Sequence, residues 1–366
     1  MTGSVKKVLG MILAGGEGSR LYPLTQQRAK PAVPFGGKYR LIDFALSNFI
    51  NSRIFSIYVL TQFKSQSLTE HLQESWRFSS ILSNHFILPV PAQQRTGDSW
   101  YRGTADAIYQ NINLIEDSDF DIIAIFGADH IYRMDLQQMI DFHIRKRADV
   151  TISGLPVPLK EASSFGVIQV QEKQRVTGFK EKPKRPKPIP GRSDEAFASM
   201  GNYLFNKDVL IELLYEDAAD VGSSHDFGKD ILPRIFNKSR VFAYDFRRNH
   251  IPGLTKKEIG YWRDVGTIKA FWEANMDLRS VKPEFNLYNK KWPVRTASYG
   301  TPPAKFVFNE DGRRGQAIDS IIAEGSIISG GIVQDSVIGR EVSIDSGATV
   351  INSLLMDRVK IGKNCK

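Results

Sequence analysis

The sequence predicts an α/β domain with a mixed, mainly parallel sheet, followed by a β-solenoid of six-residue repeats. The chain has 366 residues, roughly twice the usual length of one domain, so two domains are expected. About the first 280 residues alternate short apolar, β-branched runs with helical patterns, which is typical of a sheet with crossover helices. From Ile321 onward, apolar residues recur at six-residue intervals, which is typical of a hexapeptide solenoid.

The apolar runs of the α/β part give its elements in order. Val8 to Leu13 is predicted to be the first buried strand, and a glycine-rich turn follows it. Helical spacing predicts a crossover helix over 136–147, and a second helix is expected over 105–115. Two more buried strands and three short strands of a mixed extension are predicted at Ile57–Leu60, Asp121–Phe126, Gly166–Val170, Val176–Phe179 and Asn202–Phe205.

These patterns divide the chain into a domain over 1–280, a proline-rich linker over 281–320 and a repeat region over 321–366. In the repeat region Ile338, Ile344 and Val350 follow one another at six-residue intervals, Met356 completes the series, and Ile322 and Ile328 share the interval. An ordinary set of strands stays open as an alternative, because the period slips by one residue near Ile361. We also expect a truncated solenoid, because no polar capping coil precedes Lys366.

The charge and the cysteine content restrict the function classes. The net charge of +9 could indicate a nucleic-acid binder, but the segment Lys180–Arg192 alone holds six basic residues and one acid. Its prolines predict an extended, solvated loop without interleaved aromatic residues, so nucleic acid is not the expected partner. The single cysteine, Cys365, excludes an intramolecular disulfide. No export or membrane-spanning segment is visible, so a soluble, cytoplasmic protein is expected.

The strongest local motif is the glycine-rich turn LAGGEGSRLYPLT, which follows the first strand. The missing side chains of Gly15, Gly16 and Gly18 leave backbone N–H groups free to face phosphate oxygens. Arg20 and Lys30 follow closely enough to neutralise a polyphosphate. The motif is neither a Walker loop nor a dinucleotide fingerprint, and a tight turn without a ligand is the alternative.

Two carboxylates are candidate metal ligands. Asp129 follows the buried strand Asp121–Phe126, at the strand end where α/β folds place ligand sites. Asp264 lies in a late turn before an aromatic helix, so the two acids could complete one Mg²⁺ site. A helix N-cap is the alternative for Asp129. His130 has no histidine or cysteine partner at ligand spacing, so a packed or solvent-facing ring is expected.

Two further segments carry candidate binding residues. In WYRGTADA, Gly103 and Thr104 are expected to form a turn and an N-cap, and this helix start could receive a phosphate or stack a base. A capped helix packed by two aromatic residues is the equal alternative. In the second segment, Phe179–Pro183, a lysine carried by a strand could meet a sugar phosphate, although an exposed lysine is the default there.

Taken in order, these motifs resemble those of bacterial ADP-glucose pyrophosphorylases (glucose-1-phosphate adenylyltransferases) over nearly the whole chain. The resemblance implies a Rossmann-like nucleotidyltransferase domain followed by a left-handed parallel β-helix. It also implies that ATP and α-D-glucose 1-phosphate form ADP-glucose and pyrophosphate for glycogen synthesis. The motifs that carry it are Ala14–Gly37, Trp100–Ala107, Ser163–Val167, Glu181–Pro183, Ala198–Phe205, Ser223–Asp230 and Tyr261–Thr267.

The resemblance also implies roles for individual residues. Asp129 and Asp264 match the family's Mg²⁺ ligands, and Arg20 and Lys30 match basic groups near the triphosphate. The glycines of the turn match nucleotide-binding positions. Five positions match contacts to glucose 1-phosphate: Tyr101, Gly166, Glu181, Lys182 and Ser199. Three match positions near the adenine and ribose: Gln62, Gln94 and Trp100.

The chain departs from the family pattern at three positions. Ala128 stands where a glycine usually precedes the catalytic aspartate, a small change that should leave activity intact. Gln27 and Pro34 replace a lysine and a histidine at effector-binding positions, although Arg28 and Arg40 remain. A different phosphorylated-metabolite effector is therefore open. The family implies a homotetramer. The competing hypotheses are an enzyme that uses UTP or dTTP, a non-catalytic regulatory subunit and, remotely, a nucleic-acid binder.

Overall fold

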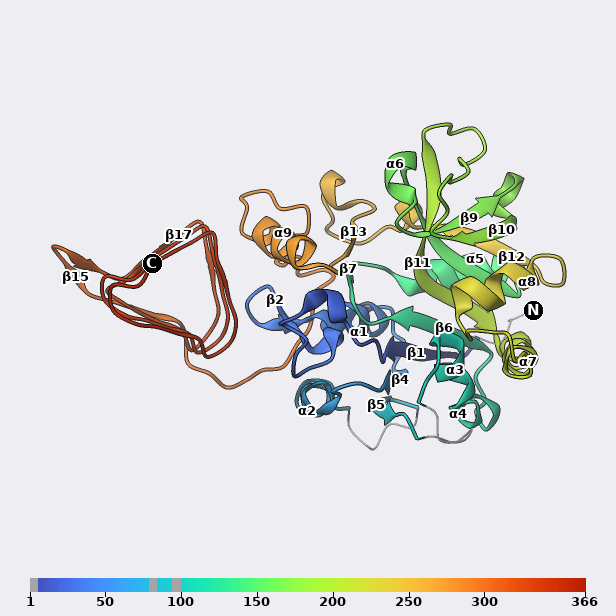
Figure 1. Ribbon diagram of the computed structural model, residues 1–366, viewed down its shortest axis with the longest axis horizontal. Helices are drawn as coiled ribbons and strands as arrows, with labels where there is room; N and C mark the ends of the chain where they lie inside the picture. The colour runs from blue at the N-terminus through green and yellow to red at the C-terminus, as the bar shows by residue number, and fades with distance from the viewer. Residues whose placement is uncertain (1–5, 79–83, 94–99) are drawn as a thin grey trace.

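The computed structural model describes residues 6–78, 84–93 and 100–366, which form a large α/β domain and a triangular solenoid (Figure 1). The solenoid (red in Figure 1) lies at one end of the molecule, on the side of the α/β domain that carries α9 (Ile268–Leu278). None of the helices in these residues is long and apolar enough to cross a membrane.

A central sheet organises the α/β domain, with its main strands in the order β10-β9-β11-β6-β1-β4-β5. β1 pairs in parallel with β4 and β6, and β4 with β5, so the predicted parallel core is confirmed. β11 runs antiparallel to β6, β8 and β9, which confirms the mixed extension. The strands are β1 (Val8–Ala14), β4 (Ser56–Thr61), β5 (Phe86–Pro91), β6 (Ile122–Gly127), β8 (Val150–Pro158), β9 (Gly166–Val170), β10 (Val176–Glu181), β11 (Glu195–Asn206) and β12 (Val241–Asp245).

Helices cover both faces of this sheet, because its central strands are apolar on both sides. Along β1, Leu9 and Met11 belong to one core, while Ile12 and Ala14 belong to the other, and all four are buried. One face is covered by α1 (Leu41–Asn51), α2 (Gln66–Ser75), α5 (Leu136–Arg145) and α6 (Leu159–Ala162). The other is covered by α3 (Thr104–Tyr109), α4 (Asn113–Glu116), α7 (Lys207–Ala218) and α8 (Leu232–Ile235).

The prediction of one helix over 105–115 is wrong in two respects. The segment is split into α3 and α4, because the Asn111 side chain bonds the carbonyl of Ala107 (2.8 Å) and competes with the regular backbone pattern. Thr104 is also not the N-cap. Gly103 occupies that position with extended backbone, and the Thr104 hydroxyl donates to Asp226 instead (3.0 Å).

The solenoid consists of three parallel sheets that form the faces of a prism (Figure 1). Ile321 pairs with Val337, sixteen positions on, and Val337 pairs with Leu354, seventeen positions on. Each coil is thus a little shorter than three full hexapeptides. The sheets contain β14 (Lys305–Val307), β19 (Ile327–Ser329), β22 (Ser343–Ile344) and β25 (Lys360–Ile361); β17 (Gln316–Ile318), β20 (Ile332–Gln334) and β23 (Thr349–Ile351); and β18 (Ile321–Ile322), β21 (Val337–Ile338) and β24 (Leu354–Leu355).

Two expectations about the repeat region need correction. Met356 does not complete the inward series, because Leu355 faces the solenoid core while Met356 packs against the α/β domain. The strand pairing also begins before residue 321, because β14 and β17 already pair with solenoid strands β19 and β20. The stretch 281–320 therefore contains part of the first coil and a small hairpin of β15 (Asn309–Glu310) and β16 (Arg313–Arg314).

The solenoid contacts α9 directly. The Trp272 indole N–H donates to the carbonyl of Asn352 (3.2 Å), and Arg279, just after α9, donates to the carboxylate of Asp335 (2.7 Å). Apolar solenoid side chains, Leu354 among them, pack on a buried cluster that includes residues of α9. A short ribbon of β2 (Pro34–Phe35) and β3 (Tyr39–Arg40) lies on the same side of the domain.

Candidate active site

A pocket of about 650 Å³ opens where β1, β4 and β6 end. Because these strands are parallel, their carboxyl ends lie at one edge of the sheet, and the loops that follow them converge there. The pocket wall includes nine of the predicted site residues: Gly15, Gly16, Gly18, Arg20, Lys30, Gln62, Tyr101, Asp129 and Glu181.

The glycine-rich turn forms one side of this pocket. Gly18 has a left-handed backbone (φ 68°), and a Cβ there would lie 2.9 Å from the Cβ of Lys30, so only glycine fits without strain. A Cβ on Gly16 would meet nothing within 4 Å, which leaves its backbone open to a ligand. The Thr25 hydroxyl donates to the carbonyl of Gly18 (2.9 Å) and fixes the turn.

Lys30 links the two acids that the sequence places far apart. Its Nζ lies 2.7 Å from Oδ2 of Asp129 and 3.2 Å from Oδ1 of Asp264, and its side chain is 8% exposed. Burial by itself lowers the pKa of Lys30, but the two carboxylates outweigh it and the pKa is raised. Burial likewise raises the pKa of Asp129, but His130 and Lys30 together bring it to about 2. Lys30 and Asp129 are therefore both charged at neutral pH.

A two-stranded ribbon brings the acids together. β7 (His130–Tyr132) directly follows Asp129, and β13 (Trp262–Asp264) pairs with it antiparallel, so that Asp264 lies opposite His130. A Cβ on Gly266 would lie 3.0 Å from Nη2 of Arg20 and 2.9 Å from Oδ1 of Asp264. This close approach explains a glycine at that position. Asp129 is thus part of the pocket and does not cap a helix.

The donor set at this ribbon fits a divalent cation. Asp129, His130 and Asp264 each offer a ligand atom, and these atoms lie within 4.8 Å of one another. The two carboxylates are the ligands that Mg²⁺ prefers. The His130 ring packs on Trp262 (ring centroids 5.0 Å apart), and its buried Nδ1 has no hydrogen-bond partner among the described residues. The expectation of a packed ring holds, but the ring also lies next to the acids.

The opposite wall of the pocket is built by the segment 223–230 on the N-terminus of α3. The backbone N–H of Ala105 donates to the carbonyl of His225 (2.8 Å), and the N–H of Phe227 donates to the hydroxyl of Thr104 (3.0 Å). The carboxylate of Asp226 accepts from the N–H of Gly228 (2.9 Å) and so begins a π-helical turn, Phe227–Ile231. Gly103 must be glycine, because a Cβ would lie 2.2 Å from the carbonyl oxygen of His225.

The residues expected near glucose 1-phosphate are only partly in the pocket wall. Glu181 and Tyr101 line it, and Gly166 lies beneath Glu181, where a Cβ would be 2.9 Å from Oε2. Lys182 is not part of the wall. Its side chain is 65% exposed and its Nζ lies 3.4 Å from Oε1 of Glu181. Ser199 is buried outside the wall, where its hydroxyl accepts from the N–H of Gly201 (3.3 Å).

The residues expected near the adenine are also divided. Oε1 of Gln62, just after β4, accepts from the backbone N–H of Tyr101 (2.8 Å), so Gln62 holds the Tyr101 segment against the pocket. Trp100 is 54% exposed and is not part of the wall. Gln94 lies outside the described residues.

Sequence reasoning left several wall residues without a role. Asp226, Phe227 and Gly228 line the pocket, as does Gly201 at a bulge of β11. The motif SSHDFGKD contains three of these residues and could have marked them as candidates. Its place in the pocket, however, depends on a contact with α3, more than a hundred residues away in the sequence. His130 could have been included from its place directly after Asp129.

Comparisons with known proteins agree with this fold and this pocket. A family model described as nucleotidyl transferase matches residues 9–281, and one described as GlmU-like, C-terminal hexapeptide matches residues 302–366. Fold and site therefore define a nucleotidyl transferase with a hexapeptide-repeat domain.

Close relatives narrow this class. A glucose-1-phosphate adenylyltransferase of Thermus thermophilus is 57% identical over 94% of this chain and 84% of its own length. Those of Deinococcus radiodurans and Aliivibrio fischeri are each 55% identical over 98% of this chain, and over 88% and 87% of their own lengths. The chain belongs to the glucose-1-phosphate adenylyltransferase family.

Proposed function

We propose that this chain transfers the adenylyl group of ATP to α-D-glucose 1-phosphate, giving ADP-glucose and pyrophosphate for glycogen synthesis. The observation that carries the proposal is the meeting of Asp129 and Asp264 at Lys30, where Lys30 and Asp129 line the same pocket as the glycine-rich turn. The names of relatives at 55–57% identity support the choice of substrates.

In this reaction a phosphate oxygen of glucose 1-phosphate forms a bond to the α-phosphorus of ATP, and the bond from that phosphorus to the bridging oxygen breaks. The electron pair leaves with pyrophosphate. Both substrates are anions, so the protein must align them and offset their charge. The backbone N–H groups of the turn at Gly15 and Gly16 face the triphosphate, and Arg20 and Lys30 offset charge on the departing pyrophosphate.

We assign a Mg²⁺ site to Asp129 and Asp264. When bound, Mg²⁺ would neutralise phosphate charge and hold the α-phosphate in line with the attacking oxygen. Lys30 already pairs with both acids, and its Nζ lies 2.7 and 3.2 Å from their carboxylate oxygens, so it holds the two side chains near one point. His130 lies close enough to steady Asp129, with its Nε2 3.6 Å from Oδ1.

The glucose 1-phosphate side of the proposal uses the wall opposite the turn. We assign the sugar hydroxyls to Glu181, which lines the pocket, and the phosphate to Lys182, which is exposed beside it. Tyr101, Gly166 and Ser199 support this wall. Adenine and ribose contacts are assigned to Gln62, Trp100 and Gln94.

Nucleotide preference tests the proposal. Pyrophosphate release is measured with glucose 1-phosphate and ATP, UTP, dTTP or GTP in turn. We expect ATP to give the highest kcat/KM by at least about tenfold, since base contacts of about 1.4 kcal/mol set that ratio. Faster release from UTP or dTTP would refute the choice of ATP. No release with any nucleotide would indicate a non-catalytic subunit.

Three further properties belong to the same proposal: control by a phosphorylated-metabolite effector, assembly as a homotetramer, and a cytoplasmic location. Arg28 and Arg40 support an anionic effector, because burial first and then the nearby charge of Arg40 lower the pKa of Arg28. Light scattering of the purified chain tests the tetramer, and rates measured with candidate effectors test the control.

A further inference from the structure

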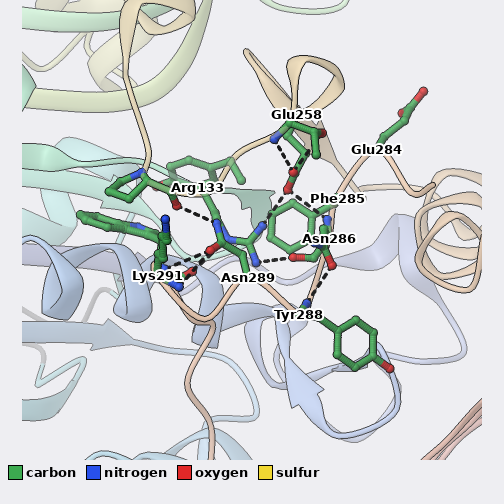
Figure 2. Close-up of polar contacts among 12 residues, drawn as sticks. Arg133, Glu258, Glu284, Phe285, Asn286, Tyr288, Asn289 and Lys291 are labelled. Carbon is green, nitrogen blue, oxygen red and sulfur yellow. Dashed lines mark hydrogen bonds and ion pairs between the residues drawn. The ribbon is translucent and has the colours of Figure 1, made fainter. Parts of the chain in front are cut away.

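A buried ion pair closes the ribbon of β7 and β13 at the end away from the acids. Arg133 directly follows β7, and Glu258 ends the 3₁₀ turn Lys256–Glu258 that precedes β13. Arg133 Nη1 donates to Oε1 of Glu258 (3.1 Å), and the two side chains are only 3% and 2% exposed. Figure 2 shows the Arg133 side chain joined by hydrogen bonds to both Glu258 and Asn286.

Both members of this pair use nearly every polar atom they have. Arg133 Nε donates to the carbonyl of Trp292 (3.1 Å) and Nη2 donates to that of Asn286 (2.6 Å). Its guanidinium carbon lies 4.2 Å from the centre of the Phe285 ring. Glu258 Oε1 also accepts from the N–H of Asn286 (3.1 Å). Its Oε2 accepts from the N–H and the hydroxyl of Thr255, at 3.0 and 3.1 Å.

The ribbon itself needs such support. Each strand has only three residues, and a two-stranded ribbon of this length is marginal without packing at its ends. An ion pair buried this deeply contributes little net stability, because desolvation offsets its attraction. Burial indeed lowers the pKa of Arg133 to about 10, with Glu258 opposing that shift. The pair instead fixes the relative positions of three segments, because it joins the end of β7, the turn before β13 and the segment 285–292.

We propose that the Arg133–Glu258 pair is a positioning element that sets the spacing of the Asp129 and Asp264 carboxylates by holding β7 and β13 in register. Neither residue lines the pocket. The inference rests on the metal site of the proposed function. Loss of the pair should therefore weaken metal binding and turnover more than glucose 1-phosphate binding, which uses the opposite wall.

The variant Glu258→Gln tests this with little change in volume. An amide NH₂ must face either Arg133 and Asn286 or the two donors of Thr255, so one set of hydrogen bonds is lost. Arg133→Lys is the second variant, because one ammonium nitrogen cannot serve three partners. The matched control is Asp149→Asn, which makes the same change opposite Arg240, outside the pocket wall.

Mn²⁺ binding to the full chain without nucleotide or sugar is measured by electron paramagnetic resonance, and kcat and KM are measured separately. We expect Glu258→Gln to raise the Mn²⁺ Kd about tenfold and to lower kcat by a similar factor, while KM for glucose 1-phosphate stays within about twofold. Arg133→Lys should change the Kd in the same direction, and Asp149→Asn should leave it unchanged.

Two results from the variants would overturn the inference. One is an unchanged Mn²⁺ Kd in a folded Glu258→Gln or Arg133→Lys chain. The other is an equal rise in Asp149→Asn, which would show general destabilisation. If the unaltered chain bound no Mn²⁺, the metal site and this inference would fall together. Failure to release pyrophosphate from ATP would refute the proposed substrates alone, because the Mn²⁺ titration does not depend on them.

Discussion

Replacement of Gly103 by alanine should detach one wall of the pocket from α3. The added Cβ would lie 2.2 Å from the carbonyl oxygen of His225 and 2.5 Å from that of Ser224. Both are backbone atoms, so the segment 223–230 must move to relieve the overlap. That movement puts three hydrogen bonds at risk: Ala105 N–H to His225, Thr104 to Asp226, and Phe227 N–H to Thr104.

The size of the effect follows from these contacts. Three hydrogen bonds at about 1 kcal/mol each give a loss of about 3 kcal/mol in the free energy of unfolding. At about 2 °C per kcal/mol for a domain of this size, the Tm should fall by about 6 °C. The moved segment carries Asp226 and Gly228 of the pocket wall, so KM for glucose 1-phosphate should rise about tenfold, the equivalent of one contact of about 1.4 kcal/mol.

Thermal denaturation and initial rates measure both effects. The matched control is Gly16→Ala, whose Cβ would meet nothing within 4 Å, so its Tm should stay within about 1 °C of the unaltered chain. An unchanged Tm for Gly103→Ala would show that the close approach at His225 does not hold this wall. An equal fall in the Tm of Gly16→Ala would show that the space around a glycine does not determine how much stability is lost when alanine replaces it.

Three other predictions concern single side chains. Asp129→Asn should lower kcat by about 10²–10⁴-fold, because it removes a proposed metal ligand and a partner of Lys30; unchanged turnover with ATP would contradict that role. Lys182→Gln should raise KM for glucose 1-phosphate far more than KM for ATP, and equal rises would count against its phosphate contact. Burial lowers the pKa of His143 below its ordinary 6.5, so the stability that its neutral ring contributes is complete above that pH and declines as pH falls. Between about pH 7.5 and 5.5, the Tm of His143→Gln should therefore fall less than that of the unaltered chain, and parallel curves would refute this.

The sequence was sufficient for those features that depend on local patterns. The strand Gly166–Val170 is found with the predicted bounds, because its apolar alternation is set by the residues themselves. Asp129, after β6, and Asp264, before α9, were predicted to serve one site, and Lys30 forms ion pairs with both of them. The turn at Gly18 was recognisable because glycines after a buried strand allow backbone conformations that other residues avoid.

The features that failed depend on contacts between distant segments. Thr104 suits an N-cap by residue type, but its hydroxyl is used by Asp226 from another part of the chain. In the solenoid, the intervals from Ile328 to Val333 and from Val350 to Leu355 are five residues instead of six, and all four side chains pack in or against the same core. Counting six residues on from Val350 therefore reaches Met356, one position beyond Leu355, which is the residue that faces the core. Nothing in the local sequence distinguishes these two spacings.

The contact between α9 and the solenoid has a mechanical consequence. α9 begins just after the loop of Asp264 and Gly266, and its eleven residues form a rod of about 16 Å that ends beside Arg279. If the rod tilts by about 4° at the solenoid end, its other end moves by about 1 Å, a displacement large enough to change a reaction rate about a hundredfold. The solenoid therefore supports the end of α9 that lies away from Asp264, through the ion pair between Arg279 and Asp335 (2.7 Å).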